Sequence, residues 1–476
     1  MLTQMRVLSD AEREQVHERT AQVLEDIGMR VDSREARRLM QEAGAGVDEG
    51  RRRVRIPRRM LEESLRLAPK SFSLGGRREG WELPLNAGGF TLLADGGATR
   101  VYHTALDELR EPTHLDWVDS TRLQDAIDDI GLYWSMVEVG KAGMETADYL
   151  EYFADLFRLF TKHAQDSFDT PAAAQALLEV LDVVFGGRDE VRRRHPFSFL
   201  ITPASPLVVE GPHTDAWLEL RGWDIPVAVM PMPLMGATAP GSLLATLVTA
   251  NAETLGTLCL IQAAQPGTPF IYAPVTAVME PRTGRYFAGA IEGAVLNAGA
   301  TEMARWYRLP VESSGGGTDQ YVPGVQAAYE KAATSLLASL AWPDILVGPG
   351  LLAGATVYNM EQLIIDVEVY RLCRRAMDGV ASDEGRWLTD VMEKVGPGGT
   401  FLGQASTRRN VRDGEWYLPQ LGFRDSWEAW GTAGRPDIIA EARQKAEDLL
   451  ATHTPAPLGD DVERELEMLA RRARSG

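Results

Sequence analysis

The chain has 476 residues, which is long for one ordinary compact core, and its 45% hydrophobic and 25% charged residues are typical of a soluble globular protein. Its 49 Lys and Arg residues face 68 Asp and Glu residues, and the net charge of -19 excludes a protein that binds nucleic acid or anionic lipid through a basic surface. Only Cys259 and Cys373 are present, which excludes a disulfide framework and indicates a cytoplasmic protein. We expect neither a secretion signal nor a membrane crossing, since no run approaches about 18 apolar residues.

The first third of the chain is predicted to be a mixed α+β accessory domain, residues 1–125. Ser9 precedes an amphipathic helix that Gly28 ends, and Ser33 with Gly44 repeats the arrangement. Short apolar segments between turns predict strands at 53–56, 72–76 and 90–97.

From about residue 126 the chain alternates short apolar segments with helices of about three turns, which is typical of repeated βα units. The predicted strands are 131–138, 158–165, 197–205, 226–234, 269–278, 309–316, 343–350 and 400–407. Eight such units can close a TIM (β/α)8 barrel, which we expect over 126–455, followed by a C-terminal helix, 456–476. A doubly wound open sheet stays open as an alternative for each segment taken alone.

In a barrel of this kind, functional side chains come from the carboxyl ends of the strands. This rule predicts Glu312, Ser314 and Asp319 as catalytic residues. The predicted substrate-binding residues are Trp134, Lys162, His163, Tyr272, Gly316, Gln404 and Arg408. The aromatic faces could hold a quaternary ammonium group by cation–π contact, although core packing is the alternative for each of them.

Two further features concern the strand ends. Three glycines follow the strand that holds Glu312, and they are interpreted either as a flexible turn or as a cradle for a ligand. Methionines and prolines in "MPMPLMGATAPG" suit an apolar pocket wall or a docking surface, or else the core.

The sequence lacks the motifs of several other kinds of functional site. The seven histidines include no pair spaced by four residues, so we expect no metal site. Neither a P-loop nor a nucleophile elbow occurs, which argues against nucleotide phosphate binding and against serine hydrolase chemistry.

Several long segments, taken in order, resemble the trimethylamine methyltransferase family, in particular its branch without pyrrolysine. They include "GATAPGSLLATLVTANAETLGTLCLIQAAQPGTPFIYAP", "GAIEGAVLNAGATEMARWYRLP", "GGGTDQYVPGVQAAYEKA" and "YNMEQLIIDVEVYR". The resemblance implies a barrel that takes a methyl group from glycine betaine or a related betaine. It also implies that the methyl group passes to the Co(I) of a corrinoid (cobalamin), carried by a separate corrinoid protein and not bound tightly by this chain.

The resemblance also has departures that bear on the substrate. Founding members carry pyrrolysine in the barrel, which we place near 314–318, where this chain has only small residues. This favours a betaine over trimethylamine, with Lys162, His163, Gln404 and Arg408 as candidates for its carboxylate. Gly324, Ser406 and Asn410 replace residues that the family carries at positions expected to face the cavity. A different methyl acceptor, a non-catalytic binder of methylated ammonium compounds and a homo-oligomer stay open.

Overall fold

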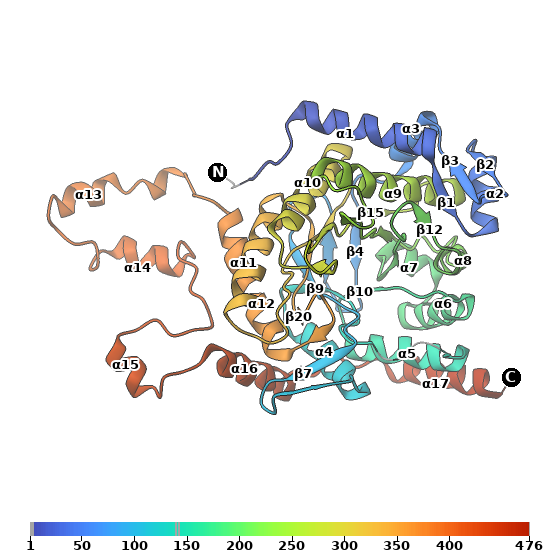
Figure 1. The fold of residues 1–476 in the computed structure, drawn as a ribbon. Coiled ribbons are helices and arrows are strands. Elements are labelled where there is room, and N and C mark those ends of the chain that lie inside the picture. The colour runs from blue at the N-terminus through green and yellow to red at the C-terminus, as the bar shows by residue number, and fades with distance from the viewer. Residues whose placement is uncertain (1–3, 139, 141–142, 476) are drawn as a thin grey trace.

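The computed structural model describes residues 4–138, 140 and 143–475, and a barrel of eight parallel strands lies at its centre (Figure 1). The strands are β6 (Thr91–Leu93), β9 (Ile130–Tyr133), β10 (His163–Asp166), β11 (Phe197–Ile201), β13 (Val227–Val229), β15 (Phe270–Tyr272), β18 (Glu312–Ser314) and β19 (Ile345–Val347). They follow one another around the sheet in chain order, and β19 returns to pair with β6. A parallel bridge between Tyr272 and Val311 closes the remaining seam. The predicted (β/α)8 barrel is therefore confirmed.

Seven predicted strands overlap barrel strands, whereas the eighth, 400–407, is wrong. That segment is a turn that leads into a helix outside the barrel, and Leu402 is 85% exposed. The missing strand is β6, from the segment 90–97 that was predicted to belong to the accessory domain. Its three residues pair on one side with β19 and on the other with β9, so they are buried on both faces. The division at residue 125 stays a prediction, but the barrel takes one strand from before it.

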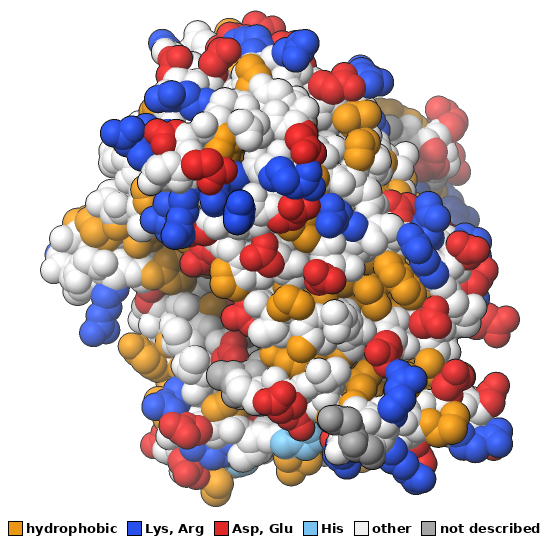
Figure 2. Space-filling model, turned by 90° about the vertical axis from the view of Figure 1, so that its right-hand side faces the viewer, with side chains coloured by type: hydrophobic (Ala, Val, Ile, Leu, Met, Phe, Trp, Pro, Cys, Tyr) orange, Lys and Arg blue, Asp and Glu red, His pale blue; other side chains and the backbone are white. Residues whose placement is uncertain are grey.

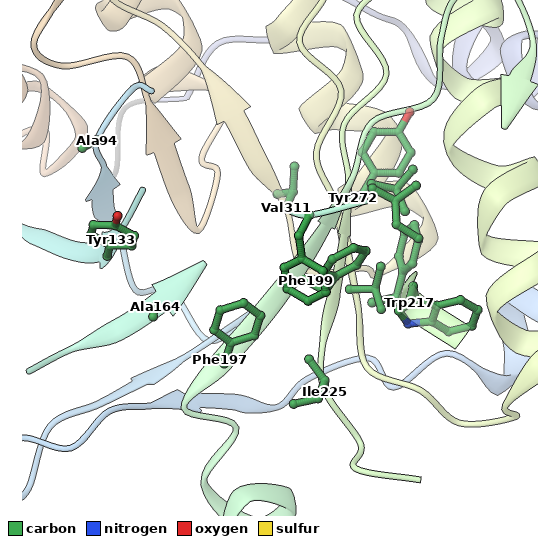
Figure 3. Packing of buried hydrophobic residues seen from close by; sticks show 14 of the residues in the cluster. Ala94, Tyr133, Ala164, Phe197, Phe199, Trp217, Ile225, Tyr272 and Val311 are labelled. Carbon is green, nitrogen blue, oxygen red and sulfur yellow. The ribbon is translucent and has the colours of Figure 1, made fainter. Parts of the chain in front are cut away.

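Helices surround the barrel on its outside. They are α4 (His114–Ala126), α5 (Thr146–Leu159), α6 (Pro171–Phe185), α7 (Arg188–Arg194), α8 (Gly211–Glu219), α9 (Leu243–Ala264), α10 (Ile291–Tyr307), α11 (Val325–Leu340) and α12 (Met360–Met377). Every second strand residue points outward into a large apolar layer beneath these helices. Figure 3 shows Phe199, Trp217 and Tyr272 within this layer.

The N-terminal segment packs across one side of the barrel. It contains α1 (Asp10–Gln22), the π-turn η1 (Val23–Ile27), α2 (Arg34–Glu42), α3 (Arg58–Leu67) and a sheet of β1 (Met29–Val31), β2 (Gly46–Asp48) and β3 (Arg53–Arg55). Ser9 caps α1 in a reciprocal capping box with Glu12, as its position predicted. The sheet also includes β12 (Val208–Val209), which comes from the loop after β11 and ties the N-terminal segment to the barrel.

Helix α9 is long and apolar enough to span a membrane, by length and composition alone. It contacts α1, α2, α3 and α10, and 78% of its most apolar window is buried inside the protein. Its apolar character is thus explained by its place between the N-terminal helices and the barrel.

A short hairpin closes the amino-terminal end of the barrel, which we call the floor. It consists of β4 (Ser73–Gly75) and β5 (Glu82–Pro84). Leu74 and Leu85 enter the barrel and pack with Leu132, Leu200 and Ile345. Because this end is filled by apolar side chains, a ligand would have to enter from the opposite, carboxyl-terminal end.

Two small sheets extend the rim at that carboxyl-terminal end. One contains β14 (Leu234–Met235), β16 (Ala277–Met279) and β17 (Tyr286–Phe287), and the other contains β7 (Arg100–His103), β8 (Glu108–Arg110), β20 (Leu351–Leu352) and β21 (Val357–Tyr358). Both are built from segments that follow barrel strands, so they lie where the strand ends open.

The C-terminal part leaves the barrel and returns to it. A short turn, η2 (Glu384–Arg386), and the helices α13 (Thr389–Val395), α14 (Ala405–Arg412) and α15 (Trp427–Thr432) form an arm that projects away from the barrel (Figure 1). Helix α16 (Ile438–Thr452) then packs on α12 and α4, and α17 (Asp460–Ser475) packs on α5 and α6. An ion pair between Arg158 of α5 and Glu463 of α17 joins the two helices. Figure 2 shows the right-hand side of the molecule in Figure 1, where basic and acidic side chains are interspersed.

Candidate active site

The carboxyl-terminal end of the barrel gathers a small set of aromatic, acidic and thioether side chains, which we call the mouth. It is formed by Asp95, Trp134, Met230, Tyr286 and Ser314. Trp134 and Met230 pack against the apolar residues of the barrel interior. Asp95, Trp134, Met230 and Ser314 follow or end barrel strands, which is where this architecture places its functional residues, whereas Tyr286 comes from the hairpin of β16 and β17.

Strand alternation decides which of the aromatic residues enters the mouth. Trp134 points into the barrel, and therefore its neighbour Tyr133 points outward, where its hydroxyl accepts from the Trp117 indole at 2.9 Å. Likewise Ile271 lines the interior while Tyr272 points outward and donates to Asn251 Oδ1 of α9 at 2.9 Å. Of the aromatic residues predicted to bind substrate, only Trp134 is at the mouth.

Trp134 lies against the loop that follows β6. A Cβ atom on Gly96 would fall 1.5 Å from the Trp134 Cδ1 atom, so only glycine fits beside the indole. The preceding residue, Asp95, accepts a hydrogen bond from the Gly96 backbone amide at 3.0 Å. The sequence Asp95–Gly96 thus brings a carboxyl group and an indole together at the mouth.

Asp95 is the acidic group of the mouth. Burial raises the pKa of its carboxyl to about 6, although the positive charge of Lys331 acts in the opposite direction. Burial also raises the pKa of the Tyr286 hydroxyl, and the charges of Asp95 and Asp319 add to this effect. Tyr286 rests on Gly354 and stays 38% exposed, so its ring is available to a ligand. An anionic carboxyl near two aromatic side chains is a suitable environment for an organic cation.

Glu312 lies beneath the mouth, two residues before Ser314 on the same face of β18. It is fully buried, and burial raises the pKa of its carboxyl to about 8, so the acid is mostly protonated near neutral pH. Oε2 accepts from the Gln165 amide at 3.1 Å, whereas Oε1 is buried with no hydrogen-bond partner among the described residues. An unmet acceptor below the mouth indicates a group that a ligand can reach or complete.

A row of hydrogen bonds crosses the barrel from the floor to Glu312. His163 Nδ1 lies 3.1 Å from the Gly75 carbonyl oxygen of the floor hairpin, and its Nε2 lies 2.9 Å from the Ser198 hydroxyl. Ser198 in turn bonds the Gln165 amide at 3.0 Å, and Gln165 bonds Glu312. Burial lowers the pKa of His163 to about 3, so its imidazole is neutral.

The glycine run after β18 packs closely against its neighbours and is not a slack turn. A Cβ on Gly315 would meet the Ser335 Cα of α11 at 2.9 Å, and one on Gly317 would meet the Ala288 carbonyl oxygen at 2.3 Å. Gly316 has a φ of +72° and its carbonyl oxygen accepts from Lys331 Nζ at 2.6 Å. The glycines therefore permit close packing of the strand end against its neighbours, and the predicted contact of Gly316 with substrate is not supported.

Lys331 fixes two strand ends at once. Its Nζ also donates to the Gly348 carbonyl oxygen at 3.2 Å and pairs with Asp366 at 2.9 Å. Asp366 accepts in addition from the Gly350 amide at 2.8 Å. This buried pair joins the ends of β18 and β19, and it explains one charged position in each of the segments "AAYEKA" and "IIDVEVYR" in structural terms.

The other two predicted catalytic residues lie at the mouth in different roles. Ser314 ends β18 with a partly exposed side chain that faces the mouth. Asp319 accepts from the backbone amides of Ala288 and Gly289 at 3.1 and 3.0 Å, so its carboxylate holds the loop after β17. Asp319 therefore shapes the rim next to Tyr286.

The remaining predicted substrate residues lie elsewhere. Lys162 precedes β10 at the floor end, where its Nζ donates to the carbonyl oxygens of Gln124 and Ile127. His163 is the first residue of β10 and lies at the floor end of the row of hydrogen bonds that leads to Glu312. Gln404 and Arg408 belong to α14 in the projecting arm (Figure 1). Lys162 and His163 were wrongly predicted to lie near the substrate because β10 begins later than predicted. Gln404 and Arg408 were wrongly predicted to do so because segment 400–407 is not a strand.

The positions that depart from the family pattern also lie outside the barrel interior. Ser406 and Asn410 are in α14 of the arm, which contradicts the expectation that they face the cavity. Gly324 precedes α11 and a Cβ there would meet nothing within 4 Å, so it is a surface position.

Sequence reasoning missed Asp95, Gln165 and Tyr286. A signal for Asp95 was present, because in "TLLADGG" an acid and two glycines follow a short apolar segment. Gln165 follows from alternation once His163 faces inward. For Tyr286 we find no signal in the sequence, since its place depends on the fold of the β16–β17 hairpin.

Two other kinds of site were considered for this protein, a metal site and a groove outside the barrel. Within residues 4–138, 140 and 143–475, no group of three His, Cys, Asp or Glu side chains could hold a metal ion. A groove of about 1020 Å³ lies outside the barrel between α1 and the start of α9, and it includes Ala237 and Pro240 of the methionine-rich segment. No inward-facing strand residue lines this groove, so it is separate from the mouth.

The chain is similar to several known proteins in sequence and in fold. The chain is 29% identical over 455 residues to trimethylamine methyltransferase MttB of Desulfitobacterium hafniense, covering 95% of this chain and 91% of the relative. It is 28% identical to the glycine betaine methyltransferase of the same species, covering 98% and 97%. The crystal structure of the monomethylamine methyltransferase MtmB of Methanosarcina barkeri shares the fold, with a TM-score of 0.51 and 13% identity over 92% of each chain. The profile of the trimethylamine methyltransferase family matches residues 1–476, and the chain belongs to that family.

Proposed function

We propose that the protein takes a methyl group from a quaternary amine, glycine betaine or a related betaine, and passes it to the Co(I) of a corrinoid on a separate protein. The observation that carries this proposal is the mouth itself, in which Asp95 lies near Trp134 and Tyr286. A carboxylate and aromatic faces attract a methylated ammonium group and need no hydrogen-bond donor from it. The similarity to methyltransferases of methylated amines supports the same substrate class.

The chain's own residues would act by binding and alignment. Trp134 and Tyr286 would hold the cationic group so that one methyl points out of the barrel, while Asp95 would balance its charge. A displacement at a quaternary nitrogen breaks the N–CH3 bond, leaves its electron pair on nitrogen and releases a neutral tertiary amine. Since that leaving group needs no proton, proximity and orientation are the main catalytic contributions of the chain.

A reduced corrinoid supplies the nucleophile that accepts the methyl group. The residues at the rim fit such a group when it is presented from outside, because Met232 is 51% exposed and Met230, two residues earlier, packs against the apolar residues of the barrel interior. Polarizable thioethers suit a flat, largely apolar ligand surface. In this proposal the cofactor stays on its own protein, and the reaction takes place in the cytoplasm.

The test uses free reduced cobalamin and a panel of glycine betaine, other betaines and trimethylamine. The expected result is a change in the visible spectrum of the cobalamin that requires the protein and a betaine, with release of the matching tertiary amine. Methyl transfer to a thiol or to a folate in the absence of corrinoid would favour a different acceptor. Tight calorimetric binding with no turnover under any acceptor would overturn the proposal in favour of a binding protein.

A further inference from the structure

The hydrogen-bond row between the floor and Glu312 has a direction that can be worked out from its fixed end. The Gly75 carbonyl oxygen can only accept, and it lies 3.1 Å from His163 Nδ1, so Nδ1 carries a hydrogen. The imidazole is fully buried and no ion-pair partner is recorded for it among the described residues, which keeps it neutral. In a neutral imidazole the other nitrogen, Nε2, must accept, and the Ser198 hydroxyl must therefore donate to it.

The same reasoning continues to Glu312. The Gln165 atom placed 3.0 Å from the Ser198 hydroxyl is Oε1, which would accept from it. Because the single hydrogen of Ser198 is used by His163, the Gln165 group at this position must instead donate, and must be the amide NH2. A half-turn of the amide exchanges its nitrogen and oxygen, which have nearly the same shape. The Gln165 oxygen then faces the Glu312 carboxyl at 3.1 Å, and that carboxyl oxygen must donate a hydrogen.

The opposite direction of the row is physically costly. It needs a doubly protonated His163 that donates to both Gly75 and Ser198. A positive charge would then lie inside the barrel without an ion-pair partner among the described residues, and ionisation of Glu312 would add a second charge that is not in contact with the first. Burial shifts the pKa of each group in the direction that avoids this state.

We propose that Glu312 is a neutral acid whose hydrogen is donated to Gln165, so that a ligand at the mouth lies above an uncharged carbonyl oxygen rather than above a carboxylate. This oxygen, Oε1, is the acceptor left unmet beneath the mouth. The protonation state rests on the row alone, whereas its meaning for a methylated cation rests on the proposed function.

A neutral Glu312 matters for the reaction because the substrate loses its positive charge as the methyl group leaves. In addition to Asp95, a second carboxylate directly beneath the nitrogen would further stabilise the cationic ground state over the transition state, and would raise the barrier. An uncharged oxygen avoids much of that penalty. Glu312 is therefore a specificity-determining residue that contacts the methylated group without forming an ion pair with it.

The titration of Glu312 can be distinguished from the titration of the charged groups around it. His163 of β10 lies at the far end of the row, Asp95 of β6 has a pKa of about 6, and Lys331 of α11 is engaged by Asp366 outside the barrel. A step near the pKa of Glu312, about 8, thus lies above the titration of Asp95 and His163.

The first experiment needs no substrate. Infrared difference spectra of the wild type minus Glu312→Gln are expected to contain the carbonyl band of a protonated carboxyl near neutral pH, and this band should disappear near pH 8. In Ser198→Ala, which lets the Gln165 amide turn, the band should disappear at a lower pH. Absence of the band near neutral pH, or an unchanged midpoint in Ser198→Ala, would overturn the inference.

The second experiment measures calorimetric binding of tetramethylammonium against pH. Wild-type affinity should rise as Glu312 ionises near pH 8, and Glu312→Gln should lack that step. A wild-type affinity that is independent of pH over this range would contradict contact between Glu312 and the cation. Both measurements can succeed even if no methyl group is ever transferred, so they separate this inference from the proposed function.

Discussion

Replacement of Asp95 by Asn separates the stability of the mouth from its affinity for a cation. Burial raises the pKa of Asp95 from 3.8 to about 6, which corresponds to at most about 3 kcal/mol of destabilisation when the carboxyl is ionised. Because the side chain keeps some exposure, we expect a gain of roughly 1–3 kcal/mol in the free energy of unfolding of Asp95→Asn near neutral pH.

The pH dependence gives the sign of this effect. The folded pKa lies above the ordinary value, so the ionised carboxyl destabilises the fold above about pH 6 and ceases to do so as pH falls toward 3.8. The advantage of Asp95→Asn over the wild type should therefore shrink on acidification through this window. Denaturant unfolding at a series of pH values measures it.

Affinity should change in the opposite direction. Loss of one negative charge beside a bound cation removes about 1–3 kcal/mol, or roughly a 5- to 150-fold increase in Kd for tetramethylammonium. Glu138→Gln is the matched control, since this exposed carboxyl follows the neighbouring strand β9 and should change stability by less than about 0.5 kcal/mol. A less stable Asp95→Asn, or one with unchanged affinity, would refute the role given to Asp95.

Further predictions concern the mouth, the strand ends and the arm. Trp134→Ala should weaken tetramethylammonium binding by about 0.5–2 kcal/mol in calorimetry, with Trp134→Phe losing less, and equal losses would argue against cation–π contact. Lys331→Met should lower the free energy of unfolding by about 3–5 kcal/mol, because it leaves the buried Asp366 without its ion-pair partner. A loss under about 1 kcal/mol in a denaturant titration would contradict this expectation. Gly317→Ala should destabilise the fold by more than Gly241→Ala, where a Cβ meets nothing within 4 Å, and equal melting temperatures would count against close packing of the run. Arg408→Ala should leave betaine affinity unchanged, and a marked loss would restore its predicted contact.

Much of the barrel could be predicted because its strands are short apolar segments separated by helices. The strand at 197–201 and the helix at 243–264 are clear in the sequence, since each is buried almost throughout its length. Strand β6 could not be distinguished from the short strands of the accessory segment, because its three residues, Thr91–Leu93, are too few to give a periodicity. The segment 400–407 had a similar composition, and only the absence of a neighbouring strand excludes it from the sheet.

The candidate site was predicted less well than the fold. The residues at the end of β18 were located correctly because "VESSGGGTD" combines a buried strand with polar residues and glycines. Lys162 and His163 were misplaced because β10 begins at His163 and not at residue 158, so both residues lie at the floor. Tyr272 was misplaced because an error of one residue exchanges the inside of the barrel for the outside. The partners of Glu312, which come from β10 and β11, could not be read from any local pattern.

The sequence by itself determined the architecture and the family, because periodic burial and long ordered segments survive without knowledge of distant contacts. It also determined that Glu312 and Trp134 are near strand ends. Only the tertiary structure decided that the glycine run packs against α11, and that Gln165, Ser198 and His163 continue from Glu312 to the floor. These properties arise from strands brought together across the barrel, and the charge of a buried carboxyl depends on exactly such neighbours rather than on its place in the chain.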